Sequence, residues 1–164
     1  MEKEEVKKSL LEYIKVIVIT VIFTFIFLQF VQVSKVVGSS MEPTYHNGNI
    51  VLVDKVFYSK PSYNDIVVVE YHAGDGKEQI IKRVVGLPGD HLEMKDNQLY
   101  RNGQLLKEDY IYEPMVGNED FSYDIPEGKI FVMGDNRNNS VDSRMIGYID
   151  FDKDVVGRVF FKVF

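Results

Sequence analysis

The sequence QIIKRVVGL at residues 79–87 has the composition of a β-strand, because four of its nine residues are Ile or Val. Pro88-Gly89-Asp90 follows it directly and stops it. Strand alternation places Ile80, Lys82 and Val84 on one face, with Arg83 on the other. A lysine between two β-branched apolar residues is poised for desolvation, which lowers the pKa of its amine. The alternative is an edge-strand lysine that guards against aggregation.

Several further stretches outward from this strand also predict β-structure. Asn49–Phe57 (NIVLVDKVF) is one, and the nearly continuous apolar run of Asp65–Tyr71 (DIVVVEY) predicts a strand buried on both faces. A polar, Tyr-rich excursion is expected at 107–127. The other predicted strands are His91–Lys95, Gln98–Arg101, Arg101–Leu106 with its turn at Asn102-Gly103, Lys129–Met133 and Val155–Val163.

These strands predict a mostly β fold, in which a strongly curved antiparallel sheet or open barrel is formed by residues 35–87 and 128–164. Residues 88–127 are expected to form a small β appendage. One transmembrane helix, residues 14–34, precedes this domain, and residues 1–13 form a cytoplasmic N-terminus.

The transmembrane prediction rests on Val16–Ser34, which contains no charged residue. A helix of this length spans about 28 Å, close to the hydrocarbon thickness of a bilayer. A buried core helix and a removable signal peptide are the alternatives, but residues 33–37 (VSKVV) offer no A-x-A-like cleavage site, so the segment is expected to stay. Lysines 3, 7, 8 and 15 precede the span and Lys35 follows it, which predicts that residues 36–164 lie on the outer face.

Composition excludes several classes of protein. The 164 residues contain no cysteine, so disulfides, zinc knuckles and a thiol nucleophile are ruled out. A formal net charge of −6 argues against a nucleic-acid binder. His46, His72 and His91 have neither triad-like nor metal-ligand spacing, and no phosphate loop or metal-binding motif is visible.

Two polar segments are candidates for chemistry. Residues 38–44 (GSSMEPT) follow the span closely, so a nucleophile at Ser40 would work near the membrane surface; a plain polar turn is the alternative. Residues 134–144 (GDNRNNSVDSR) are dense in Asp, Asn, Arg and Ser, which also suits a solvated loop. A calcium loop fails, because its sixth position is Ser140 and its twelfth is Ile146. Residues 138–140 match a glycosylation sequon, a pattern too common to weigh much.

Four short sequence motifs, together with their order along the chain, resemble those of bacterial type I signal peptidase, peptidase family S26. Residues 40–44 (SMEPT) match that family's S-M-x-P-T box, and 82–90 (KRVVGLPGD) match K-R-x-x-G-x-P-G-D. Residues 134–144 match G-D-N-R-x-x-S-x-D-S-R, and 64–68 resemble the G-D-I-V box with Asn64 in place of Gly.

The resemblance implies a Ser/Lys dyad. Ser40 is then the nucleophile, with its own backbone N–H as an oxyanion donor, and Lys82 the general base. Ser140 is expected to hydrogen-bond the Lys82 amine and orient it. Some members carry a hydroxyl donor at the position of Gly38, so the second oxyanion donor stays open here.

The remaining site residues implied by the resemblance are supporting ones. Asp142 and Arg144 are expected to form an ion pair, and Asp135 is expected to pair with Arg83. Gly38, Met41 and Pro43 belong to the active-site loop around Ser40.

The implied function is a membrane-anchored serine endopeptidase of the cell membrane that removes signal peptides from secretory preproteins. It needs no cofactor or metal, and it accepts small residues such as Ala at −1 and −3 in an extended, strand-like contact. A self-cleaving repressor of related β fold would need a DNA-binding module where this chain has its span. An inactive tethered binding domain would lack Ser40 or Lys82. A specialised peptidase, for pilin-like or spore substrates, stays open.

Overall fold

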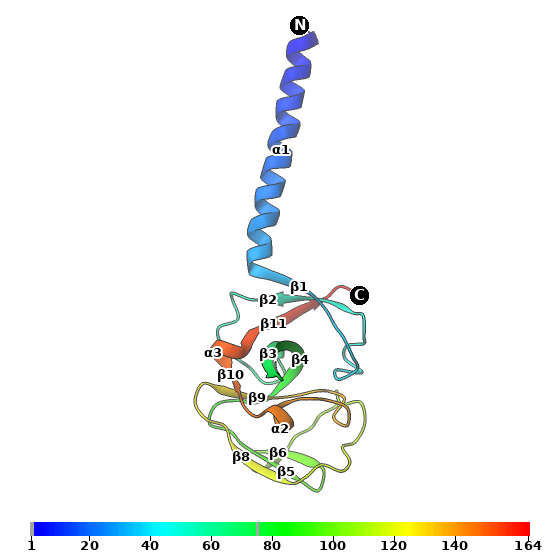
Figure 1. The fold of residues 1–164 in the computed structure, drawn as a ribbon, viewed down its shortest axis with the longest axis vertical. Coiled ribbons are helices and arrows are strands. Elements are labelled where there is room, and N and C mark those ends of the chain that lie inside the picture. The colour runs from blue at the N-terminus through cyan, green and yellow to red at the C-terminus, as the bar shows by residue number, and fades with distance from the viewer. Residues whose placement is uncertain (1, 75) are drawn as a thin grey trace.

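A computed structural model describes residues 2–74 and 76–164 of the chain. It shows one long helix, α1 (Glu2–Phe30), standing on a domain built from two antiparallel sheets (Figure 1). Within the part of α1 from Val6 to Phe30, an 18-residue stretch reaches a mean hydropathy of 2.3, so the helix is long and apolar enough to cross a membrane. No side chain of this apolar stretch is buried by the domain, and the helix projects away from the sheets (Figure 1), which suits a lipid-embedded anchor.

The helix ends earlier than the predicted span of residues 14–34. It stops at Phe30, and the next five residues form strand β1 (Val31–Lys35), which pairs with β2 (Ile50–Asp54). The last predicted residues of the span are therefore part of the sheet. The polar residues Gln32 and Ser34 gain partners there, and Val31 is buried. The ring of Phe30 stacks on that of Phe57, with centroids 5.7 Å apart, so the foot of the helix contacts the loop after β2.

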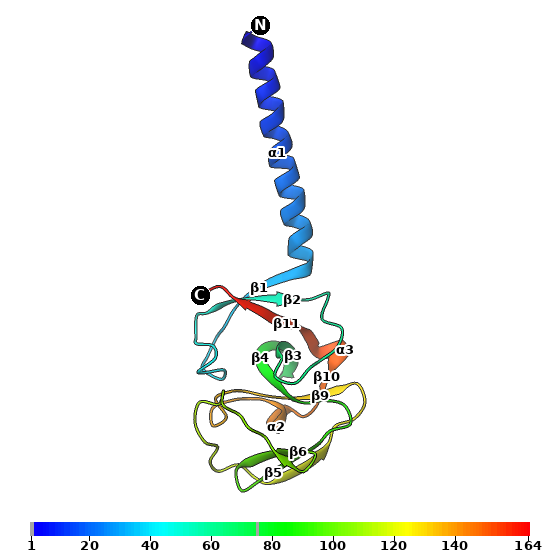
Figure 2. The same ribbon diagram turned by 180° about the vertical axis from the view of Figure 1, so that it is seen from behind.

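The larger sheet has seven strands in the order β1-β2-β11-β3-β4-β9-β10, and all its pairs are antiparallel. The C-terminal residue Phe164 lies beside β1 and β2, as the view from behind shows (Figure 2). Two short helices, α2 and α3, connect the last strands. The remaining bounds are β3 Ile66–Ala73, β4 Gly76–Gly86, β9 Lys129–Met133, α2 Ser143–Ile146, β10 Ile149–Asp150, α3 Phe151–Asp154 and β11 Val155–Lys162.

The smaller sheet forms the appendage and has four strands in the order β7-β6-β5-β8. Its strands β5 and β6 have the predicted bounds, and the turn between them places Asp96 and Asn97 at positive φ, where these residue types are tolerated. Strand β8 falls inside the segment expected to be an excursion. The bounds are β5 His91–Lys95, β6 Gln98–Arg101, β7 Gln104–Leu105 and β8 Phe121–Asp124.

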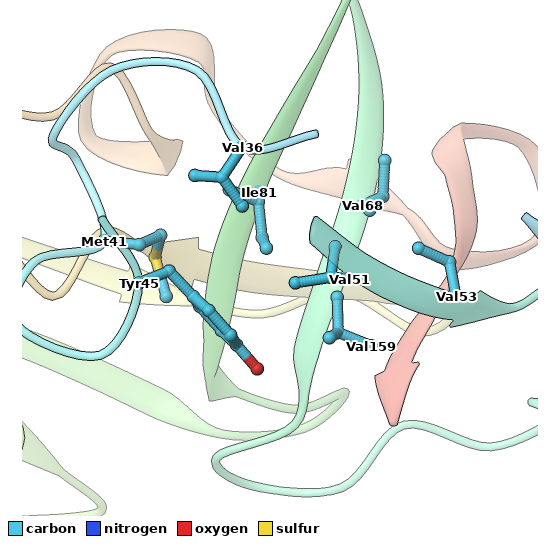
Figure 3. Close-up of a cluster of buried hydrophobic side chains, with 8 residues drawn as sticks. All are labelled: Val36, Met41, Tyr45, Val51, Val53, Val68, Ile81 and Val159. Carbon is cyan, nitrogen blue, oxygen red and sulfur yellow. The ribbon is translucent and has the colours of Figure 1, made fainter. Parts of the chain in front are cut away.

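The core lies on both faces of the β3–β4 pair, as predicted for the apolar run in β3. Val68 and Ile81 belong to a cluster on one face, which Figure 3 shows with residues from β2, β11 and the turn after β1. Val67, Val69 and Val84 belong to a cluster on the other face. Since neighbouring residues of one strand enter different clusters, β3 and β4 are central strands of the domain.

Strand β9 contributes to two clusters by alternation. Ile130 and Val132 pack with the β3–β4 pair, whereas Phe131 and Met133 pack with the appendage. The appendage cluster also takes Val85 from β4. The two sheets therefore share buried side chains from the same strands.

Candidate active site

Lys82 and Ser40 meet in the structure, although 42 residues separate them in the chain. Lys82 lies on β4, and Ser40 lies in the turn between β1 and β2, residues 36–49, which we call the Ser40 turn. The Lys82 Nζ donates to Ser40 Oγ at 2.7 Å and to the carbonyl oxygen of Ile81 at 2.7 Å. A serine hydroxyl and a lysine amine at this distance can exchange a proton directly.

Burial changes the acidity of this amine. Lys82 is 2% exposed, and desolvation lowers its pKa from 10.5 to about 8. The carboxylates of Asp142 and Asp135 oppose that effect, since their negative charge favours the ammonium form. With a pKa of about 8, about a tenth of the molecules carry a neutral amine at pH 7. At the ordinary lysine pKa that fraction would be about 300-fold smaller.

Two buried side chains anchor the Ser40 turn. Met41 and Tyr45 are 1% and 9% exposed, and both enter the cluster around Ile81 (Figure 3). The Tyr45 N–H donates to the Met41 carbonyl at 2.9 Å, which closes one helical turn. Of the other residues expected in this loop, Gly38 has φ +87°, a conformation that favours glycine, and Pro43 is exposed. The core thus fixes the backbone that presents Ser40.

The residues that follow β9 hold the same turn from a second side. We call residues 134–142 the 134–142 loop. The Asn136 N–H donates to the Ser40 carbonyl at 3.0 Å, and Asn136 Nδ2 donates to the Ser39 carbonyl at 3.2 Å. Asn139 Nδ2 donates to Ser39 Oγ at 2.9 Å. The backbone on both sides of the Ser39–Ser40 peptide bond is therefore bound to this loop.

Gly134 leaves room for this contact. A Cβ at position 134 would collide with the Ser140 side chain and with the Ser40 carbonyl oxygen. Ser140 therefore packs beside the Ser40 backbone. Its Oγ is buried close to the Asp142 carboxylate and helps to lower the pKa of that group. The expected hydrogen bond between Ser140 and the Lys82 amine is absent, because that amine is directed at Ser40 Oγ and the Ile81 carbonyl.

Arg83 and Asp135 form the expected ion pair. Arg83 Nε and Nη2 donate to the two carboxylate oxygens of Asp135 at 2.8 and 2.6 Å. Thr44, from the Ser40 turn, donates its hydroxyl to the same carboxylate at 2.5 Å. Arg83 Nη1 also donates to the carbonyl of Asn64, the residue that replaces Gly in the fourth box. Asp135 thus connects β4, the 134–142 loop and the Ser40 turn.

Asp142 and Arg144 also pair as expected. Arg144 Nε and Nη2 donate to the Asp142 carboxylate at 2.9 and 2.8 Å, and the Gly134 N–H donates to it at 3.0 Å. Burial alone would raise the pKa of Asp142, but the charge and hydrogen bonds of Arg144 outweigh burial and hold that pKa below 3.8. Asp142 therefore stays ionised, caps α2 and closes the 134–142 loop on itself.

A cavity of about 290 Å³ lies beside Ser40 and Lys82. Its lining comes from β1, β2, β3, β4 and the Ser40 turn, and most of it is β-branched and apolar. The lining residues are Ser34, Lys35, Val36, Val37, Ser40, Val51, Val68, Gln79, Ile80, Ile81 and Lys82. Such a cavity suits short apolar side chains of an extended peptide.

The backbone around Ser40 has one N–H that is free to donate to an oxyanion. The Ser40 N–H has no acceptor within the described residues. The Gly38 N–H is already bonded to Asn47 Oδ1 at 3.1 Å, and Gly38 has no side-chain donor. Gly38 therefore does not supply the second donor that the resemblance left open. Among residues 2–74 and 76–164, no group of three His, Asp or Glu side chains could hold a metal ion.

Local sequence reasoning missed Thr44, Asn136 and Asn139 as parts of the site. Thr44 and Asn136 occupy fixed positions of the motifs that carry the resemblance, so a motif match could have marked them, whereas Asn139 falls at an unspecified position. Their contacts with Asp135 and Ser39 join segments that are far apart in the chain, and no local pattern reveals such contacts.

Comparison with known proteins gives one consistent result. Residues 10–164 match the family described as signal peptidase, peptidase S26. The chain is 40% identical to signal peptidase I of Bacillus licheniformis, over 88% of this chain and 83% of that protein. It is 36% identical to signal peptidase IB of Staphylococcus aureus, over 95% and 90%. A crystal structure of a signal peptidase I from Enterococcus faecalis superimposes with a TM-score of 0.51 at 32% identity, over 62% of this chain and 98% of that one.

Proposed function

The chain belongs to the signal peptidase family, peptidase S26, and from this premise we propose that it cleaves signal peptides from secretory preproteins with Ser40 and Lys82 as its catalytic dyad. Family membership makes it a serine endopeptidase of signal peptide processing. The observation that supports the dyad is the 2.7 Å contact between a buried lysine amine and a serine hydroxyl beside an apolar cavity.

The chemistry begins with the neutral Lys82 amine, which accepts the Ser40 hydroxyl proton as Oγ attacks the scissile carbonyl carbon. The carbonyl oxygen becomes an oxyanion, to which the Ser40 N–H donates. The Lys82 ammonium then protonates the departing amine as the C–N bond breaks, leaving an ester on Ser40. Lys82 next deprotonates a water molecule that attacks this ester. Collapse of the second intermediate transfers the proton from Lys82 to Ser40 Oγ and releases the new carboxylic acid, which loses its proton to solvent.

The decisive experiment incubates the detergent-solubilised protein with a secretory precursor and maps the N-terminus of the product. The wild-type chain should give one new N-terminus at the signal-peptide boundary. Ser40→Ala and Lys82→Ala should each abolish cleavage while keeping the β-rich circular dichroism spectrum. Full activity of purified Lys82→Ala would exclude the dyad.

We also propose that α1 anchors the protein in the cell membrane with its N-terminus in the cytoplasm, so that Ser40 works on the outer face. Four lysines before the uncharged stretch support this orientation. Because the chain has no cysteine, Ser9→Cys and Asp152→Cys each give a single thiol. A membrane-impermeant maleimide applied to intact cells should label Asp152→Cys and leave Ser9→Cys unlabelled; the opposite pattern would reverse the orientation.

A further inference from the structure

The segment between β7 and β8, residues 106–120, lies outside both sheets, and we call it the connector. One of its side chains makes a closed ion pair with the 134–142 loop. Arg137 donates through Nη1 and Nη2 to the two carboxylate oxygens of Glu108, each at 2.6 Å. The Arg137 and Glu108 side chains are 0% and 6% exposed. This two-point geometry fixes the position of the guanidinium as well as its charge.

Arg137 passes this constraint to the backbone of the 134–142 loop. Its Nε donates to the Gly134 carbonyl at 3.0 Å, so the side chain connects the start of the loop to its middle. The neighbouring residue, Asn136, binds the carbonyls of Ser39 and Ser40. Glu108 is therefore separated from the Ser40 backbone by one side chain and one short stretch of loop.

Tyr110 adds a second contact between the connector and the arginine side chains of the site. The guanidinium carbon of Arg83 lies 4.0 Å from the centroid of its ring, and that of Arg137 lies 5.9 Å from it. The Tyr112 N–H donates to the Asp135 carbonyl at 2.9 Å. The connector thus contacts both arginines and the backbone of the residue that pairs with Arg83.

We propose that Glu108 is a positioning residue for Ser40, acting through Arg137 and the 134–142 loop. The proposal rests on the proposed function, because it assigns a role in the reaction of Ser40. Removing the Glu108 carboxylate leaves a buried guanidinium without its partner, so Arg137 must rearrange to reach water. The loop that holds the Ser39 and Ser40 carbonyls then loosens, and the nucleophile loses its alignment with the scissile bond.

The position of the cavity indicates which kinetic constant a Glu108 variant should change. No residue of the connector or of the 134–142 loop lines the cavity beside Ser40. Loss of the Glu108–Arg137 pair therefore leaves peptide binding intact and impairs the chemical step. Since small misplacements of reacting groups are costly, we expect Glu108→Ala to lower kcat about tenfold, with KM within about twofold of wild type.

The experiment measures kcat and KM for cleavage of a precursor peptide by full-length wild type, Glu108→Ala, Glu108→Gln and Asp109→Asn. Asp109→Asn is the matched control, since it removes an acidic charge one residue away whose side chain is 78% exposed. It should retain wild-type kcat and KM. Glu108→Gln keeps one acceptor oxygen, so its kcat should lie between those of wild type and Glu108→Ala. Assays are run well below the thermal midpoint of each variant, and Glu108→Gln carries the test if Glu108→Ala does not fold.

A double variant tests the route through Arg137. Glu108→Gln combined with Arg137→Ala should be no slower than Arg137→Ala alone, because both changes break the same pair. A kcat within twofold of wild type in both Glu108 variants, a loss carried by KM, or losses that multiply in the double variant would overturn the proposal. Those results leave the proposed function standing, provided that wild type cleaves. Absence of cleavage by wild type would remove the proposed function and this inference together.

Discussion

Arg83 and Asp135 form a buried ion pair in which both guanidinium-to-carboxylate hydrogen bonds are short, at 2.8 and 2.6 Å. Their side chains are 9% and 0% exposed. Arg83 follows Lys82 on β4, and Asp135 precedes Asn136, which binds the Ser40 carbonyl. The pair therefore joins the strand of Lys82, the proposed general base, to the loop that holds Ser40, the proposed nucleophile.

Asp135→Asn should destabilise the protein by about 3 kcal/mol, because it leaves the Arg83 charge buried without a partner. The measurement is chemical denaturation of the purified protein in detergent, followed by circular dichroism. As a comparison, Asp152→Asn alters an exposed acidic side chain and should leave stability within about 0.5 kcal/mol. Equal stabilities of the two variants would show that the buried pair contributes nothing.

The rate of cleavage should rise with pH through about 8. Only the neutral Lys82 amine can accept the Ser40 proton, and below its pKa of about 8 that form falls about tenfold for each pH unit. The test is kcat/KM between pH 6 and 9 with a peptide substrate that has no group titrating in that range. A profile that is flat over these values would contradict the role of Lys82.

Lys82→Met should raise the unfolding temperature at pH 7. The pKa of Lys82 is about 8 when folded and near its ordinary value of 10.5 when unfolded, so the unfolded chain binds more protons between pH 8 and pH 10.5. Wild type therefore carries a penalty of up to about 3 kcal/mol below pH 8, which disappears as the pH rises past 10.5. The gain measured for Lys82→Met should accordingly shrink between pH 7 and pH 10; a gain that does not depend on pH would contradict the desolvation argument.

Ser140→Ala should change the stability of the protein by less than about 1 kcal/mol, because the buried Ser140 Oγ makes only a weak contact with the Asp142 carboxylate. We expect it to retain far more cleavage activity than Ser40→Ala, since Lys82 is already directed at Ser40 by its contact with the Ile81 carbonyl. Thermal melting and the peptide assay check both statements. Complete loss of activity in a folded Ser140→Ala protein would assign Ser140 a direct part in the reaction.

Three strands of this fold have the bounds that the sequence predicted, for a physical reason. Strands β5, β6 and β9 have the predicted bounds, because each contains buried apolar residues and is flanked on both sides by Asp, Asn or Gly. Strand β1 was missed, since its valines continue the apolar run of α1 and the switch from helix to strand depends on pairing with β2. Strand β8 (FSYD) is short and polar, and only its pairing with β5 makes it a strand.

The residues of the candidate site also fall into two groups, those that the sequence reveals and those that only the folded structure reveals. Ser40 and Lys82 stand out through family motifs, and the desolvation of Lys82 follows from its place between Ile80 and Val84. The partners of these residues do not stand out, because pairs such as Glu108 with Arg137 join positions 29 residues apart. Burial decides which of many possible charge pairs form, and burial is a property of the folded chain.

The alternation of β9 has a thermodynamic consequence. Phe131 and Met133 pack against the appendage, while Ile130 and Val132 pack against the β3–β4 pair of the larger sheet. Unfolding of either sheet would therefore expose apolar side chains that the other sheet needs for its own core. A calorimeter should accordingly record one heat-absorption peak for everything beyond the anchor. Excising the appendage to obtain a smaller enzyme would open the interior to water and give an insoluble product.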